Sequence, residues 1–213
     1  MPTKEQLMDS WRHLCRKAGL SNADDLGATL IACYSEPHRV YHGLDHLYHL
    51  IKLLEELSAD PRILLAAWFH DAIYLPGQTD NEARSAALAL EKLGSYGYPR
   101  ESTTFVSAAI LATASHHTDC REFDVLLDAD LSILGASAEE YLAYRTAIRR
   151  EYALMTEQSF IAGRLAFVRT MLSQPFIYQT TYCRNRYELP ARQNLQAELE
   201  ELLQKIVATN VCN

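Results

Sequence analysis

Apolar residues recur at spacings of three and four along almost the whole chain, and runs of strict alternation are nearly absent. This period is typical of amphipathic helices, because side chains three and four positions apart share one helix face. Proline and glycine mark the breaks between the periodic segments. The pattern therefore predicts an all-α fold. The expected helices cover about residues 4–17, 22–34, 44–57, a fourth segment that opens at 61, then 80–93, 101–115, 126–134, 138–155, 158–172 and 189–207.

Residues that favour helix ends support several of these boundaries. Gly19 is expected to end the first helix, and Ser21 or Asn22 to cap the second. Asp60-Pro61 should open the fourth helix, because proline is tolerated in the first turn, and this helix is expected to carry His70-Asp71. Thr79 or Asp80 is a plausible cap for the next helix, and Gly135 is expected to end the short segment after residue 126.

The size and composition of the chain are those of a globular protein. With 213 residues, of which 48% are hydrophobic and 22% charged, one domain can bury a sizeable core. We therefore expect a single domain over residues 1–213, with a metal-site core at about 38–135 and C-terminal helices at about 138–207. The net charge of −7 argues against nucleic acid as the main partner, because phosphate backbones attract positive fields.

The five cysteines are scattered and show no C-x-x-C spacing, which favours reduced thiols over disulfides or a zinc ribbon. The N-terminus has no signal-like apolar stretch, and no apolar run approaches membrane-spanning length. We therefore expect a cytoplasmic protein without a membrane partner. Its oligomeric state cannot be read from the sequence.

The pair His70-Asp71 is the most informative feature of the chain. It lies in an apolar run that extends from Ile63 to Ile73. An unpaired buried carboxylate is strongly unfavourable unless a cation or another partner compensates its charge. The pair therefore indicates a site where such a partner binds.

Further imidazoles and carboxylates occur in comparable settings. His46 lies early in the expected third helix, and Asp130 lies in the short segment after a polar loop. Ligands that converge from separate elements are typical of metal centres with open positions for water and substrate. A shell of imidazole and carboxylate suits one or two ions of Mn, Fe, Co, Ni or Zn and, with more water, Mg.

The order of these residues resembles the signature of the HD-domain superfamily of metal-dependent phosphohydrolases. That signature is a histidine, a His-Asp pair and a distant aspartate, here His46, His70-Asp71 and Asp130. Other blocks are similar to a subgroup of predicted HD phosphohydrolases of unassigned substrate, and the likeness spans about residues 38–200. The blocks are residues 41–46, 67–71, 80–86, 127–135, 148–152 and 191–195.

The resemblance implies an HD-like helical bundle that hydrolyses a phosphoester or phosphoanhydride of a small, nucleotide-like substrate. The implied metal ligands are His46, His70, Asp71 and Asp130. A metal-bound hydroxide would attack phosphorus, and His42 would protonate the leaving group. This last role is physically sensible, since imidazole titrates near neutrality and His42 precedes His46 by four residues, on the same face if a helical turn is already formed there.

Several assignments stay open. Asp128 is an alternative to Asp130, and His116 or, less well placed, His117 could complete a second metal position. Glu82 could orient a water molecule, and Arg84 has the fork geometry to hold a phosphate oxygen. For both residues, a solvated helix start is an equally good interpretation. The acids Glu198, Glu200 and Glu201 are most simply a solvated face.

Three rival functions are compatible with the sequence. The same pocket could bind a nucleotide without turnover, as a sensor. It could hold two irons and oxidise its substrate, as some members of the HD superfamily do. The chain could also be a helical interaction module with a structural metal. A full set of candidate ligands and the presence of His42 favour the hydrolase.

Overall fold

The computed structural model describes residues 2–211, and side chains up to residue 208. This part of the chain is all helical and contains no β-strand, as the hydrophobic period predicted. It divides into two compact units, one up to Ala129 and one from Asp130 onward. Each unit is described by itself, and the expectation of a single domain stays a prediction.

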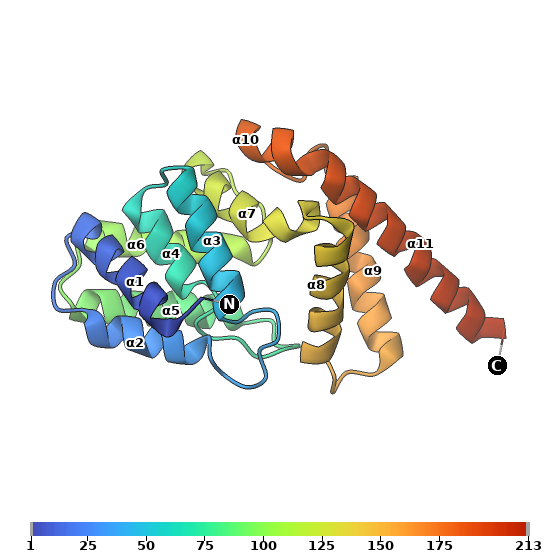
Figure 1. Ribbon diagram of the computed structural model, residues 1–213, viewed down its shortest axis with the longest axis horizontal. Coiled ribbons are helices and arrows are strands. Elements are labelled where there is room, and N and C mark those ends of the chain that lie inside the picture. Colours follow the sequence, from blue (N-terminus) through green and yellow to red (C-terminus); the bar gives the residue numbers. More distant parts are fainter. Residues whose placement is uncertain (1, 212–213) are drawn as a thin grey trace. The chain divides into compact units, whose positions relative to one another are not determined.

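The first unit is built from helices joined by loops of different lengths, the longest of which precede α3 and follow α4 (Figure 1). Its last helix, α7, extends one residue past the boundary between the units. The elements are α1 (Lys4–Ala18), α2 (Asp24–Cys33), α3 (Leu44–Glu56), α4 (Pro61–Phe69), α5 (Asn81–Ser95), α6 (Arg100–Thr113), the short 3-10 helix η1 (Arg121–Phe123) and α7 (Asp124–Asp130).

Helix α4 forms the centre of this unit. It packs against α1, α3, α5 and α6, and every residue from Ile63 to Phe69 is buried. Trp68 meets Trp11 of α1 edge to face, with ring centroids 5.1 Å apart. Because α4 is enclosed on all sides, the residues that follow its C-terminal end also lie in the interior, and these are His70 and Asp71.

The second unit consists of a 3-10 segment followed by helices, of which α9 packs against α11. Asn194 of α11 donates to the carbonyls of Leu134 and Ala136, 2.9 Å from each, and so ties the long helix to the start of the unit. The elements are η2 (Leu131–Gly135), α8 (Ala138–Glu151), α9 (Glu157–Ser173), the short α10 (Thr181–Cys183), the π-helical η3 (Arg184–Glu188) and α11 (Leu189–Val211).

Most expected helix ends agree with the structure. Gly19 ends α1 in the left-handed conformation, with φ of 72°. Pro61 lies in the first turn of α4, and the side chain of Asp60 accepts a 2.7 Å hydrogen bond from the backbone of Arg62. Asp80 occupies the cap position of α5 but forms no capping hydrogen bond through its side chain. Gly135 ends η2.

Three boundaries and one segment differ from expectation. Helix α8 ends at Glu151 rather than at residue 155. Helix α2 begins at Asp24 rather than directly after Ser21 or Asn22, because the backbone of Asn22 is left-handed, with φ of 54°, and Ala23 takes the cap position. Helix α4 ends at Phe69, so His70 caps it and Asp71 follows it. Residues 181–188, for which no helix was expected, form α10 and η3.

No helix in the described part of the chain has both the length and the apolar character needed to cross a membrane. The four cysteines in this part, Cys15, Cys33, Cys120 and Cys183, are free thiols. Cys212 lies outside the described residues.

Candidate metal centre

Three of the sequence-predicted ligands meet in space. His46 comes from the first turn of α3, His70 caps α4, and Asp130 is the last residue of α7. One ligand atom of each lies within 4.8 Å of the others. The division into units falls directly before Asp130, within the last turn of α7.

The carboxylate of Asp71 lies next to the same histidines. Its Oδ2 atom is 3.2 Å from Nε2 of His70 and 3.9 Å from Nε2 of His46. The two Nε2 atoms are 3.2 Å apart. Two nitrogens bound at about 2.1 Å to one cation lie roughly 3.0–3.4 Å from each other, so the imidazoles are spaced as a pair of ligands on one ion would be.

The protonation of His70 favours a metal-binding role for its outer nitrogen. Nδ1 lies 2.8 Å from the carbonyl oxygen of Ala67, which can only accept a hydrogen bond, so Nδ1 carries the proton. The hydroxyl of Tyr34 lies 3.4 Å from the same nitrogen. In the neutral ring, Nε2 therefore offers a lone pair toward His46 and Asp71, as in metal sites whose outer hydrogen bonds set the tautomer of a ligand.

The site is buried, and its charges interact strongly. His46, His70 and Asp71 are 7%, 2% and 8% exposed. Burial alone would raise the pKa of the Asp71 carboxyl. Where no cation is bound, the charge and the hydrogen bond of a doubly protonated His70 outweigh burial, with smaller contributions from His42 and His46 in their protonated forms, and the pKa lies below its ordinary value. The carboxylate is therefore ionised at neutral pH, as a ligand must be.

His42 lies beside this cluster but not on helix α3. The helix begins only at Leu44, so the argument from a shared helix face was wrong. Instead, the loop before α3 brings the His42 ring to a centroid distance of 5.7 Å from the ring of His46 and 4.3 Å from that of Tyr74. When it is protonated, His42 is also one of the groups that lower the pKa of the Asp71 carboxyl.

The two aspartates of α7 lie in different environments. Asp128 is 1% exposed and, like Asp71, is not one of the three residues whose ligand atoms all lie within 4.8 Å of one another. His116 follows the end of α6 in a left-handed backbone conformation, with φ of 49°, and also lies outside the cluster, while His117 is exposed. The second metal position therefore stays a prediction.

Glu82 and Arg84 lie in the first turn and a half of α5, half-buried and exposed respectively, and their predicted roles are untested by this geometry. Their neighbours have a clear structural role. The Asn81 side chain bonds both backbone groups of Leu75 at 3.0 Å, and the Ser85 hydroxyl bonds both backbone groups of Ile73. These two residues hold the loop that follows the His70-Asp71 turn.

Sequence reasoning missed two residues that contact the site. The Tyr34 hydroxyl accepts a 3.2 Å hydrogen bond from the backbone N–H of Asp71, and Arg39 donates to the carbonyl of Asp71 at 2.7 Å. Neither residue belongs to the motif of histidines and aspartates. The one feature of the sequence that could have pointed to Arg39 is its position three residues before His42.

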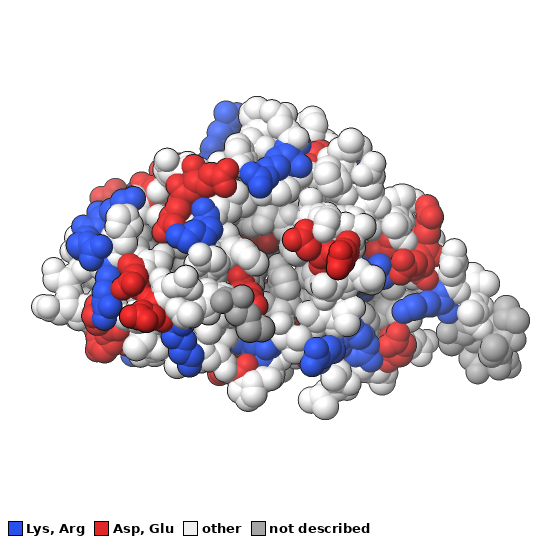
Figure 2. Space-filling model, viewed as in Figure 1, with Lys and Arg blue, Asp and Glu red and all other residues white. Residues whose placement is uncertain are grey.

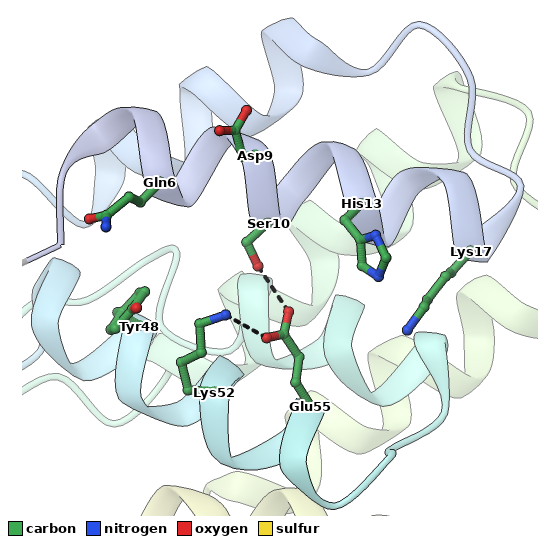
Figure 3. A pocket seen from close by; sticks show the side chains of 8 residues that line it. All are labelled: Gln6, Asp9, Ser10, His13, Lys17, Tyr48, Lys52 and Glu55. Atoms are coloured by element: carbon green, nitrogen blue, oxygen red, sulfur yellow. Dashed lines mark hydrogen bonds and ion pairs between the residues drawn. The ribbon is translucent and has the colours of Figure 1, made fainter.

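A surface groove lies between α1 and α3 (Figure 3), with a volume of about 490 Å³. None of the candidate ligands lines it. Glu55 at its centre accepts hydrogen bonds from the Ser10 hydroxyl at 3.2 Å and from the Lys52 ammonium at 2.7 Å. Three of its lining side chains therefore bind one another, and none of the eight is a candidate metal ligand.

No family model, curated protein or solved structure matches the chain. The resemblance to HD-domain phosphohydrolases is therefore carried by the motif residues alone and stays a prediction.

Proposed function

We propose that this protein is a metal-dependent phosphohydrolase that acts on a small, nucleotide-like phosphoester or phosphoanhydride. One observation carries the proposal: His46, His70 and Asp130, which are far apart in the sequence, bring ligand atoms within 4.8 Å of one another. The adjacent Asp71 adds a buried carboxylate that needs a cationic partner. Both features are expected of a metal centre and are unnecessary in a helix core.

The donor set suits a divalent cation. It combines imidazole nitrogens with carboxylate oxygens, the mixture used by Mn, Fe, Co, Ni and Zn. When bound, such a cation supplies a Lewis acid that withdraws charge from phosphoryl oxygens and makes water more acidic. His46, His70, Asp71 and Asp130 would hold it.

His42 is the residue proposed to move a proton. Attack by water on phosphorus breaks the bond to the leaving oxygen, which then needs a proton. The imidazole of His42 lies beside the cluster, and as an imidazole it can donate near neutral pH. His42 would therefore act on the leaving group without holding the cation.

The test begins with protein stripped of metal. Mn²⁺ binding is measured by calorimetry, and hydrolysis of p-nitrophenyl phosphate, nucleotides and cyclic dinucleotides is measured with Mn²⁺, Co²⁺, Mg²⁺, Ni²⁺ and Zn²⁺. We expect tight binding of Mn²⁺ and turnover of at least one phosphoester. Absence of turnover in every combination, or a coloured diiron species that oxidises its substrate, would contradict the proposal.

Variants separate the two roles. His46→Ala should abolish tight Mn²⁺ binding, and His49→Ala should not, because His49 lies on the same helix but is exposed. His42→Gln should retain Mn²⁺ affinity and lower the turnover number by roughly 10²-fold or more, the usual contribution of a positioned acid. An unchanged turnover number in His42→Gln would rule out the proton-donor role.

A further inference from the structure

Arg39 is an arginine whose side chain is completely buried, in the segment between α2 and α3. A buried guanidinium is costly unless its N–H groups find acceptors. Here Nε donates to the carboxylate of Glu36 at 3.0 Å, and the two terminal nitrogens donate to backbone carbonyls. The central carbon of the guanidinium lies over two aromatic rings, 5.3 Å from the centroid of Tyr34 and 5.4 Å from that of Tyr74.

The backbone acceptors of Arg39 belong to the turn that carries Asp71. Nη1 lies 2.7 Å from the carbonyl of Asp71, and Nη2 lies 3.2 Å from that of Ala72. Helix α4 ends at Phe69, so these carbonyls have no partner in a continuing helix. The backbone N–H of Asp71 is held in turn by the Tyr34 hydroxyl at 3.2 Å. Side chains therefore bind both polar backbone groups of Asp71 and fix the orientation of its peptide units.

The same guanidinium reaches the segment that carries the proposed proton donor. Nη1 also donates to the carbonyl of His42, at 3.2 Å. One nitrogen thus bridges the backbone of His42 and the backbone of Asp71, which lie 29 positions apart in the sequence. A lysine could not reproduce this arrangement, because its single ammonium lacks the planar fork that serves several acceptors at once.

We propose that Arg39 is a positioning residue. It fixes the position of the loop that carries His42 relative to the turn that carries Asp71, and so sets the geometry of the metal centre. The inference rests on the proposed function. Arg39 would touch neither the cation nor the substrate, and it would act through the two peptide segments that it joins.

The experiment compares Arg39→Met with Arg62→Met. Arg62 is a matched control in the same unit, since it also pairs with carboxylates, at 2.9 Å from Asp60 and 3.5 Å from Glu122, and lies over the ring of Phe105. It stands at the opposite end of α4 from His70. For each variant, urea unfolding gives the stability, calorimetry gives the dissociation constant for Mn²⁺, and the visible absorption of added Co²⁺ reports the ligand geometry.

We expect Arg39→Met to weaken Mn²⁺ binding by about 10- to 100-fold, the usual effect of losing an outer partner of a metal site, and to change the Co²⁺ spectrum. Arg62→Met should retain the Mn²⁺ affinity and the Co²⁺ spectrum of the parent protein even if it lowers stability. Arg39→Lys, which keeps the charge, should fold and recover only part of the affinity. It provides the test if Arg39→Met does not fold.

The outcomes distinguish this inference from the proposed function. If the parent protein binds Mn²⁺ and the folded Arg39 variants bind it equally well with an unchanged Co²⁺ spectrum, Arg39 has no positioning role and the metal centre stands. If Arg62→Met weakens binding as much as Arg39→Met, the effect is one of general stability and the inference is also overturned. If the parent protein binds no divalent cation, the proposed function fails first, and the inference falls with it.

Discussion

Two aspartates of α7, Asp128 and Asp130, show how a spacing of two residues decides the chemistry of a side chain. A helix turns through about 100° per residue, so positions two apart point in directions roughly 200° apart. Asp130 joins His46 and His70, while Asp128 is 1% exposed and lies outside that group. The two carboxylates are therefore expected to respond differently to substitution.

Asp130→Asn should abolish tight Mn²⁺ binding, because the amide removes a negative charge from the ligand set. Asp128→Asn should retain Mn²⁺ binding but lower the free energy of unfolding by about 1–3 kcal/mol, the cost of disturbing a buried polar group. Calorimetry with Mn²⁺ and urea unfolding of both variants check this. If Asp128→Asn loses the metal while Asp130→Asn keeps it, the ligand assignment on α7 is reversed.

Helices α8, α9 and α11 of the second unit meet around one carboxylate, that of Glu198. It was expected to belong to a solvated face with Glu200 and Glu201, and this was wrong for Glu198, which is 2% exposed. Arg164 of α9 donates to both of its oxygens, at 2.8 and 3.0 Å, and Tyr141 of α8 donates its hydroxyl proton to the same group. The spacing of apolar residues could not reveal this pairing, because each partner occupies a position in its helix where an ordinary solvent-exposed polar residue would also fit.

The pKa of Glu198 reflects these partners. Burial would raise it, but the hydrogen bonds and charges of Arg164, Tyr141 and Arg145 lower it below the ordinary value. A carboxyl whose pKa is lower in the folded state contributes stability above its unfolded pKa. That contribution is lost as the pH falls through the folded pKa.

Glu198→Gln should therefore lower the free energy of unfolding by about 3–5 kcal/mol at neutral pH, because it leaves the buried Arg164 without its counter-charge. The difference from the parent protein should shrink below about pH 4, where unfolded glutamate is itself protonated. Urea unfolding at several pH values measures both effects. Glu201→Gln is the control, since Glu201 is exposed and its ion pair with Arg145 should contribute no more than about 1 kcal/mol. Equal losses of unfolding free energy in the two variants would show that the buried network stabilises the protein no more than the exposed ion pair does.

At the scale of the whole molecule, the charged side chains do not create a positive field that would attract a phosphorylated substrate. The net charge is −7, and on the face drawn in Figure 2 acidic and basic side chains are interspersed. A cation at the cluster would add positive charge at the place where a phosphate is proposed to bind. Because the proposed ligands come from distant parts of the chain, only the folded state would assemble the site.

Metal binding should therefore stabilise the folded protein. At a free Mn²⁺ concentration of 100 times the dissociation constant, the gain is about 2.7 kcal/mol, which raises the melting temperature of a chain of this size by roughly 5–10 °C. Thermal unfolding in Mn²⁺ and in EDTA measures the shift. His70→Ala should show no such shift, whatever its own melting temperature. A parent protein whose melting temperature is the same in both buffers would contradict the proposed metal centre.

Most helices could be predicted from the sequence, because the spacing of apolar residues and the presence of caps such as Asp60 are local properties. The order of His46, His70-Asp71 and Asp130 likewise indicated a metal site before any geometry was known. The sequence could not show that α4 stops at Phe69 or which of the two α7 aspartates joins the histidines. Nor could it show which groups accept hydrogen bonds from Arg39. These features depend on contacts between segments far apart in the chain, and such contacts leave no periodic trace along it. Packing around α4 buries His70 and Asp71 at its C-terminal end, and packing among the helices of the second unit brings Glu198 to Arg164 and Tyr141.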